Sequence, residues 1–311
     1  MLSRRNIRIK VMQVLYALNR NPELSLLEGE KRYQASIQKS FDLFLYNLVF
    51  LQKVAAYSLK EYEKRQEKLL PTEEDKKFRP ILWDNPLIES IRLNPDFEKR
   101  CKRAGLYGKI DSDNVRIYYN EFSKTDTYQN YLKLENPSNE DHKAVLLELY
   151  RTCAKDESFE EIMEEHFASW QDDESLVVGS VKKLIKSLPV EGRFFDAYEP
   201  EEEATQDFGL ELLRLTYRNE DELLEDIKPT LQNWDVDRVA ILDLIMIKMA
   251  VCELTMFPSI PTKVTLNEFV EIAKSYSTDK SKDFINGILD RLMKQLSKDG
   301  KINKEGRGLI E

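Results

Sequence analysis

The chain has 311 residues, of which 41% are apolar, and its 47 basic and 56 acidic side chains give a net charge of −9. This length and apolar content can form the core of one large domain or of two ordinary ones, which excludes disorder throughout the chain. Only 10 residues are glycine, about half the usual share of ~7%, and no dinucleotide fingerprint, P-loop or nucleophile-elbow string occurs. The composition therefore argues against a nucleotide-binding α/β fold and predicts an all-α protein.

The first predicted helix begins at Arg5 and ends before Asn21-Pro22, because its apolar residues recur every three to four positions. Residues 1–20 contain no acid and five basic residues, namely Arg4, Arg5, Arg8, Lys10 and Arg20. The helix dipole disfavours cations at the start of a helix, so the dipole does not explain this cluster. The cluster therefore predicts that these residues bind an anion from outside the chain. Nucleic acid is the main candidate, because lysine and arginine neutralise phosphates.

The remaining elements are expected to be helical as well. A long amphipathic helix is predicted for residues 35–70, then short helices and loops for 71–140, three helices at 144–150, 159–170 and 176–188, and an acidic linker at 196–207. A helical pair at 210–227, a central helix at 238–256 and a helical hairpin at 265–296 follow. The helix at 238–256 is apolar nearly all round, which is typical of the centre of a bundle.

Two details of the final hairpin invite an interpretation. Thr265 and Glu268 have the spacing of a capping box, which predicts a helix start at Thr265. Gly287 inside the last helix costs about 1 kcal/mol relative to alanine, which predicts the close approach of a neighbouring helix. Asn286 beside it fits either a buried backbone contact or a ligand contact.

The negative charge is confined to one segment. Residues 140–207 contain 19 acidic and 7 basic residues, a balance of −12, which leaves +3 for the rest of the chain. The Glu201–Glu203 run is expected to be solvated. The overall charge therefore does not exclude a nucleic-acid partner.

Nothing in the sequence predicts a catalytic or metal site. His142 and His166 have no metal-ligand spacing and are expected on the surface, and Asp172–Glu174 is expected to be a solvated helix start. Cys101, Cys153 and Cys252 are far apart, which favours a reducing compartment. No run approaches the ~18 apolar residues of a membrane span, so we expect a cytoplasmic, non-enzymatic protein without cofactor or membrane partner.

The C-terminal part carries the most specific pattern. It reads NWDVDR at 233–238, Leu242-Asp243, Glu253-Leu254, IPTKVTLNE at 260–268, Ala273-Lys274 and FINGIL at 284–289. In order and spacing, residues 205–296 resemble the signature of the NusB family of bacterial transcription antitermination factors. Arg4-Arg5 followed by VMQVLY at 11–16 is similar to the first helix of that family.

The resemblance implies a NusB-like helical bundle with a large helical insertion. Its expected parts are the first helix of the bundle at 1–22, a helical insertion at 23–204 that is acidic in its second half, the C-terminal bundle at 205–298 and a flexible tail at 299–311. Part of the acidic segment can stand in for the second and third helices of the family. Lys248 stands at the usual arginine position of the central helix, which keeps the charge and loses the fork geometry.

The resemblance also implies an RNA-binding antitermination factor for ribosomal RNA transcripts. Its implied partners are boxA-like RNA, the ribosomal small-subunit protein NusE, and the transcription complex of RNA polymerase with other Nus factors. RNA contacts fall on Arg4, Arg5, Arg8, Gln13, Tyr276, Lys280, Phe284 and Asn286, and contacts with NusE fall on Tyr16 and Asp243. Aromatic rings such as Tyr276 and Phe284 suit stacking on single-stranded bases, although Phe284 fits a core position equally well.

An alternative interpretation is a NusB-like scaffold or a substrate-guiding module of RNA modification or ribosome assembly, without catalysis of its own. Some RNA cytosine methyltransferases begin with a NusB-like domain. This chain has no glycine-rich cofactor loop and only 15 residues after Leu296, which argues against methyl transfer.

Overall fold

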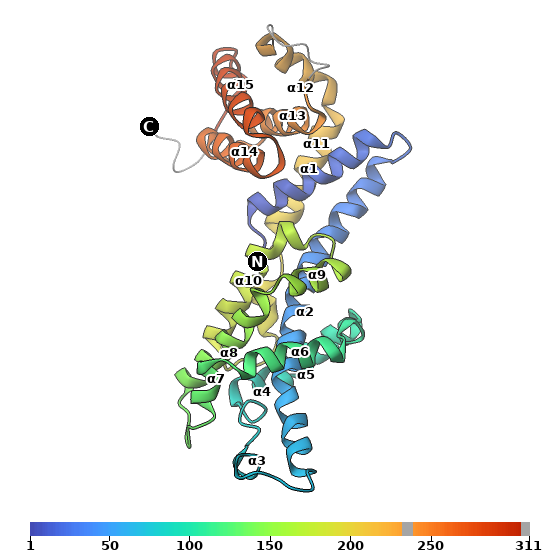
Figure 1. The fold of residues 1–311 in the computed structure, drawn as a ribbon. Coiled ribbons are helices and arrows are strands. Elements are labelled where there is room, and N and C mark those ends of the chain that lie inside the picture. The colour runs from blue at the N-terminus through green and yellow to red at the C-terminus, as the bar shows by residue number, and fades with distance from the viewer. Residues whose placement is uncertain (232–238, 306–311) are drawn as a thin grey trace. The chain divides into compact units, whose positions relative to one another are not determined.

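The computed structural model describes residues 1–231 and 239–305, apart from the side chains of residues 279 and 280. All the regular secondary structure of these residues is helical (Figure 1), which confirms the all-α prediction. The NWDVDR motif at 233–238 lies outside the described residues. None of the described helices combines the length and apolar character needed to cross a lipid bilayer.

The chain divides into two compact units. One, which we call the terminal unit, comprises Leu2–Ile37 and Pro200–Glu311, and the other, the central unit, comprises Met1 and Gln38–Glu199. Helix α2 (Leu26–Gln66) contributes residues to both units. Each unit is described by itself below.

The terminal unit gathers helices from both ends of the chain. Besides the start of α2, its elements are α1 (Arg4–Arg20), η3 (Glu203–Leu210), α11 (Glu211–Arg218), α12 (Glu220–Ile227), η4 (Lys228–Leu231), α13 (Ile241–Met256), α14 (Thr262–Tyr276) and α15 (Asp279–Lys298). Helix α13 packs against α1, α11, α12, α14 and α15. In Figure 1 the blue α1 lies beside α11 and the orange α13. The central helix expected from its apolar sequence is therefore found, and it is buried almost throughout.

The central unit is built from short helices around the middle of α2. These are α3 (Glu73–Lys77), α4 (Pro86–Arg92), α5 (Pro95–Arg103), η1 (Leu106–Lys109), α6 (Ser112–Ser123), α7 (Asp126–Tyr131), α8 (Asn139–Ala154), α9 (Glu157–His166), α10 (Trp170–Ser187) and η2 (Phe194–Tyr198). Asn85 and Asn94 cap α4 and α5, and a proline occupies the first turn of each, so these starts follow local sequence rules. The short helices predicted for 71–140 are confirmed.

The middle of α2 is buried on all sides. Residues 43–52 are all buried, and the polar Asn47 among them accepts a hydrogen bond from the Tyr150 hydroxyl at 2.9 Å. Its amide donates to the Leu43 carbonyl oxygen at 2.9 Å. Buried polar groups of this kind are tolerated because they are paired.

Several local expectations are wrong. Helix α2 begins at Leu26 and ends at Gln66 instead of covering 35–70. Most of the expected acidic linker at 196–207 lies in η2 and in the π-helical η3. His142 is buried and its Nδ1 lies 2.7 Å from the Tyr131 hydroxyl oxygen, while Asp173 is buried and accepts a hydrogen bond from Ser40 at 2.5 Å. His142 and Asp173 are buried because each has a polar partner on another helix.

The two expectations for the last hairpin are also wrong. Helix α14 begins at Thr262, with Pro261 as its N-cap, so Thr265 lies inside the helix and caps nothing. Gly287 has open space where a side chain would start, with no atom of a neighbouring described residue within 4 Å. Gly209 is the glycine that a close approach requires, since a Cβ there would overlap the Tyr33 hydroxyl and the Ile7 side chain.

Candidate nucleic-acid interface

The exposed arginines of the predicted RNA surface lie at the start of α1. Ser3 caps this helix in a reciprocal capping box with Asn6, which fixes where the first turn begins. The side chains of Arg4 and Arg5 are 42% and 46% exposed. Arg4 contacts Glu203 at 3.1 Å across an exposed ion pair. Both arginines therefore keep part of their guanidinium surface open to solvent.

Arg5 makes the stronger of the two surface pairs. Its Nε and Nη2 atoms each donate to one carboxylate oxygen of Glu268 on α14, both at 2.8 Å. These hydrogen bonds hold the pKa of Glu268 below its usual range. The paired geometry is the one that guanidinium groups also offer to phosphate.

A pocket of about 390 Å³ adjoins these arginines. It is lined by Ser3, Arg4, Arg5, Arg8, Ile260, Pro261, Val264 and Glu268. Val264 is exposed, so the pocket joins basic groups to an apolar edge. This combination can hold a phosphate with an adjoining sugar or base.

Arg8 is placed differently from its neighbours. Its side chain is 1% exposed and donates two hydrogen bonds of 2.7 Å to Glu253 on α13. The hydroxyl of Thr265 donates to the same carboxylate at 2.7 Å. Arg8, Glu253 and Thr265 form what we call the buried arginine cluster, and the expected RNA contact of Arg8 does not fit this burial.

The ring of Phe208 lies beside the arginines at the start of α1. The Phe208 ring of η3 lies 5.4 Å from the Arg4 guanidinium and 5.0 Å from that of Arg8. Cations over ring faces are stabilised by the quadrupole of the ring. Glu253 and Phe208 were missed by sequence reasoning. Two signals point to Glu253: it is the one acid between Leu244 and Leu254 in the apolar run of α13, and it stands in the Glu253-Leu254 part of the family pattern.

The other predicted RNA residues lie on α14 and α15. Tyr276 and Phe284 are half-buried and Asn286 is exposed. The side chain of Lys280 lies outside those that the structure describes. The hydroxyl of Ser277, next to Tyr276, donates to the Asp243 carboxylate at 2.6 Å, which holds the end of α14 against the start of α13.

The two residues expected to meet a protein partner differ in exposure. Tyr16 on α1 is 41% exposed, whereas Asp243 is buried and has its hydrogen bond with Ser277. Gln13, one turn before Tyr16, is half-buried. Only Tyr16 of the two therefore offers a large side chain to a partner.

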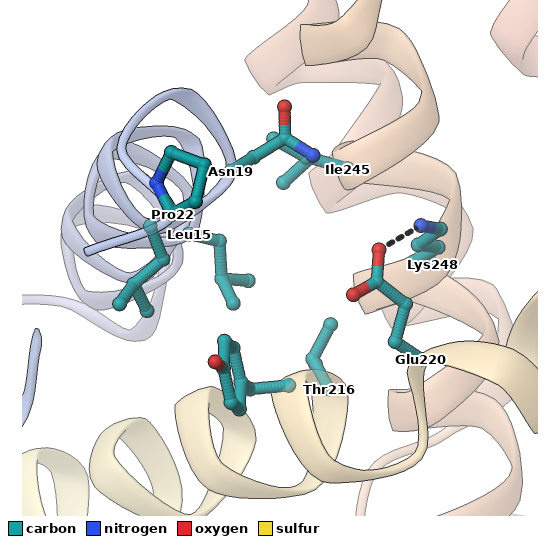
Figure 2. Close-up of a pocket in the computed structure, with 9 residues that line it drawn as sticks. Leu15, Asn19, Pro22, Thr216, Glu220, Ile245 and Lys248 are labelled. Carbon is teal, nitrogen blue, oxygen red and sulfur yellow. Dashed lines mark hydrogen bonds and ion pairs between the residues drawn. The ribbon is translucent and has the colours of Figure 1, made fainter. Parts of the chain in front are cut away.

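A second pocket lies beside the C-terminal half of α1. It has a volume of about 240 Å³ and is lined by Leu15, Leu18, Asn19, Pro22, Thr216, Tyr217, Glu220, Ile245 and Lys248. Figure 2 shows side chains of α1, α11 and α13 turned toward one space, with the ion pair of Glu220 and Lys248 on one side. The Lys248 Nζ atom lies 2.5 Å from the Glu220 carboxylate. Lys248 thus pairs with Glu220 through a single Nζ atom, whereas an arginine could offer a fork of two donors.

Comparisons with known proteins agree on one family. The model of the NusB family matches residues 178–294. The transcription antitermination protein NusB of Salinibacter ruber is 41% identical over 110 residues, which are 35% of this chain and 69% of that protein. The protein of the same name from Chloroherpeton thalassium is 37% identical over 106 residues, which are 34% of this chain and 50% of that protein. A solved structure of T. maritima NusB covers 36% of this chain and 74% of its own, with 28% identity and a TM-score of 0.30.

The matched region begins earlier than the resemblance predicted and leaves α1 outside. It starts at residue 178, inside α10, and residues 1–177 precede it. Helix α1 nevertheless packs against α11, α13 and α14, which all belong to the matched region. The arginines at the start of α1 are thus brought to the matched helices by the fold.

Proposed function

The chain belongs to the NusB family, and from that premise we propose that it is an RNA-binding transcription antitermination factor. It binds boxA-like RNA of ribosomal RNA transcripts together with NusE, in a complex with RNA polymerase and other Nus factors. It carries out no catalysis of its own. The relatives named above support this role through their printed name, transcription antitermination protein.

One observation carries the proposal. Helix α1 belongs to the same compact unit as the matched helices α11 to α15, although residues 21–210 separate them in the chain. We therefore assign α1 as the first helix of the family domain, and residues 23–177, which lie between α1 and the matched region, as an insertion. The exposed arginines of α1 then have the place that an RNA-binding first helix requires.

The RNA surface in this proposal centres on Arg4 and Arg5. Their guanidinium groups are accessible and already hold carboxylates, so a phosphate can replace Glu268 or Glu203 as their partner. Tyr276, Phe284 and Asn286 on the hairpin, with Lys280 and Gln13, complete the proposed contacts. Arg8 supports this surface from inside the buried arginine cluster.

The exchange of partners at Arg5 gives a sharp test. Changing Glu268→Gln removes the competing charge, so affinity for boxA-like RNA should rise several-fold, while Arg5→Ala should lower it about tenfold. Arg20→Ala, which removes an exposed arginine from the other end of α1, serves as the control and should change little. Equal affinities for all four proteins would rule out Arg5 as an RNA contact.

The proposed surface for NusE lies on the other half of α1. Tyr16 is exposed there, and the pocket lined by Leu15, Leu18 and Tyr217 can receive an apolar side chain of the partner. Tyr217 is exposed beside it. Asp243 contributes in this proposal by fixing the start of α13.

The experiment that tests the whole proposal is a titration of boxA-like RNA, and of a scrambled control RNA, with and without NusE. We expect a preference for the boxA sequence that grows when NusE is added, because the joined surfaces share one loss of translational entropy. NusE binding that is insensitive to salt, with no RNA bound in either case, would instead support the scaffold alternative.

A further inference from the structure

A third pocket lies in the central unit, among residues that precede the family match. It has a volume of about 430 Å³, which is within the usual range of ~300–1,000 Å³ for small-molecule sites. It is lined by Gln52, Lys53, Ala56, Trp83, Arg92, Glu98, Lys102 and Tyr107. These residues come from α2, the turn before α4, the end of α4, α5 and η1.

The pocket is unusual because two donors in its wall have no acceptor. The Nε2 atom of Gln52 and the Nε atom of Arg92 are buried and make no hydrogen bond within the described part of the chain. Gln52 is 8% exposed, so its amide is nearly closed off from bulk solvent. A buried donor without an acceptor costs roughly 1–3 kcal/mol. Both donors therefore point to a bound group rich in acceptor oxygens or nitrogens.

The charges around the pocket favour an anion. Glu98 is compensated by Lys102 at 2.5 Å, and Arg92 contacts Glu89 at 3.0 Å. Lys53 is exposed and has no ion pair with any described residue. The segment 92–109, which forms one side of the pocket, contains six basic and two acidic residues. Lys53 is thus the cation best placed to meet a phosphate.

Aromatic rings provide the apolar part of the wall. The backbone N–H of Trp83 donates to the Ser58 hydroxyl at 2.9 Å, which fixes the turn that carries the ring. The guanidinium of Arg92 lies 3.6 Å from the centre of the Trp83 ring, and Lys53 lies 5.6 Å from that of Tyr107. Trp83 and Tyr107 are both half-buried, so part of each side chain is accessible.

We propose that this pocket binds a nucleotide, with its base against Trp83 and Tyr107, its polar edge at Gln52 and Arg92, and its phosphate at Lys53. Aromatic side chains, unmet donors and a basic wall in one cavity match the face of a base, its polar edge and the phosphate of a nucleotide. The ligand is either a free nucleotide or one residue of a single-stranded RNA. The pocket uses none of the residues assigned to boxA binding, so the two proposals stand separately.

The test is binding of mant-labelled AMP to the full chain, followed by fluorescence anisotropy. Lys53→Ala and Gln52→Leu should each weaken binding at least about fivefold. Lys39→Ala, which removes another exposed lysine from α2 away from the pocket, should leave it unchanged. Gln52→Leu removes an unpaired polar group and should keep or raise the stability in urea, which separates a loss of binding from a loss of fold.

Competition then identifies the ligand. Unlabelled AMP or a five-residue oligoadenylate should displace the probe at least tenfold better than ribose 5-phosphate or inorganic phosphate. Stronger competition by AMP would indicate a free nucleotide as the ligand, and stronger competition by the oligoadenylate would indicate RNA. Equal competition by phosphate, displacement by an acidic peptide, or no saturable binding would overturn the proposal. The Arg4→Ala/Arg5→Ala variant should bind the probe normally, so a failure of the boxA proposal would be seen independently.

Discussion

The buried arginine cluster shows how a charge reaches the inside of a helical bundle. Arg8 and Glu253 are 1% and 0% exposed, and their two hydrogen bonds with the one from Thr265 satisfy the carboxylate. Such a pair is weak evidence for added stability, because desolvation offsets the attraction. Loss of one partner, however, leaves a buried charge without compensation.

Glu253→Gln should therefore lower the free energy of unfolding by about 3–5 kcal/mol, as measured by urea denaturation. Arg4→Ala, which breaks the exposed pair with Glu203, should cost less than about 1 kcal/mol and is the matched control. The double variant Arg8→Met/Glu253→Met should recover most of the loss. A loss below about 1 kcal/mol for Glu253→Gln would contradict the role given to the cluster.

Two glycines should respond in opposite ways to alanine. At Gly209 the added Cβ overlaps the Tyr33 hydroxyl, which donates to the Thr205 carbonyl oxygen at 2.8 Å, so Gly209→Ala should cost about 1–3 kcal/mol. At Gly287 the added Cβ meets open space beside α15, so Gly287→Ala should raise the free energy of unfolding by as much as about 1 kcal/mol. Thermal unfolding of both variants checks this, and the same sign for both would refute the packing described.

The exposure of single residues could be predicted where the local sequence pattern decides it. The exposure of Arg4, Arg5 and Tyr16 agrees with their places on an amphipathic first helix. Arg8 could not be placed in this way, because its burial depends on Glu253, which lies 245 positions away. The same holds for Thr265, whose hydroxyl bonds with Glu253 and not with the start of its own helix.

At the scale of elements, Lys304 and Glu305, which follow α15, contact the end of α13. Lys304 donates hydrogen bonds to the carbonyl oxygens of Glu253 and Phe257, both at 2.9 Å, and the Glu305 N–H donates to the Pro258 carbonyl oxygen at 3.0 Å. These bonds satisfy carbonyl groups that the end of a helix leaves without partners. Burial lowers the pKa of Lys304 to about 8.

This pKa predicts how stability changes with pH. Between pH 8 and about 10 the unfolded chain holds more protons at Lys304 than the folded chain does, so the contribution of this group to the free energy of unfolding rises with pH. The free energy of unfolding of the original chain minus that of Lys304→Met, both measured by urea denaturation, should therefore increase from pH 7 to pH 10. Lys301→Met is the control, because an ion pair with Asp226 raises the pKa of Lys301. A flat difference for Lys304→Met would contradict the burial of its amine.

Helix boundaries were predictable to the extent that caps decide them. The start of α1 is fixed by Ser3 and Asn6, close to its predicted start. The early start of α2 was missed, although Ser25 and Glu28 have the spacing of a capping box and their side chains lie 2.7 Å apart. The start of α14 was misplaced for the opposite reason, since the pattern at Thr265 and Glu268 serves contacts with α13 and α1.

At the scale of the whole molecule, the fold class and the family followed from the sequence, whereas the pockets did not. The pocket of the central unit needs residues from α2 to η1 that no pattern in the chain connects. Counting the charged residues of the sequence locates the negative charge, because residues 140–207 carry −12 and the rest of the chain carries +3. The arginines proposed for RNA binding lie outside that segment.

The most direct test of the RNA proposal is the salt dependence of boxA binding. Each phosphate contact on a single strand contributes about 0.7 to the slope of log affinity against log salt. Replacing Arg4 and Arg5 together by alanine should therefore reduce the slope by about 1.4 and lower the affinity at least about tenfold, with NusE present and absent. A slope and an affinity equal to those of the Arg20→Ala control would contradict the assignment of α1 to RNA.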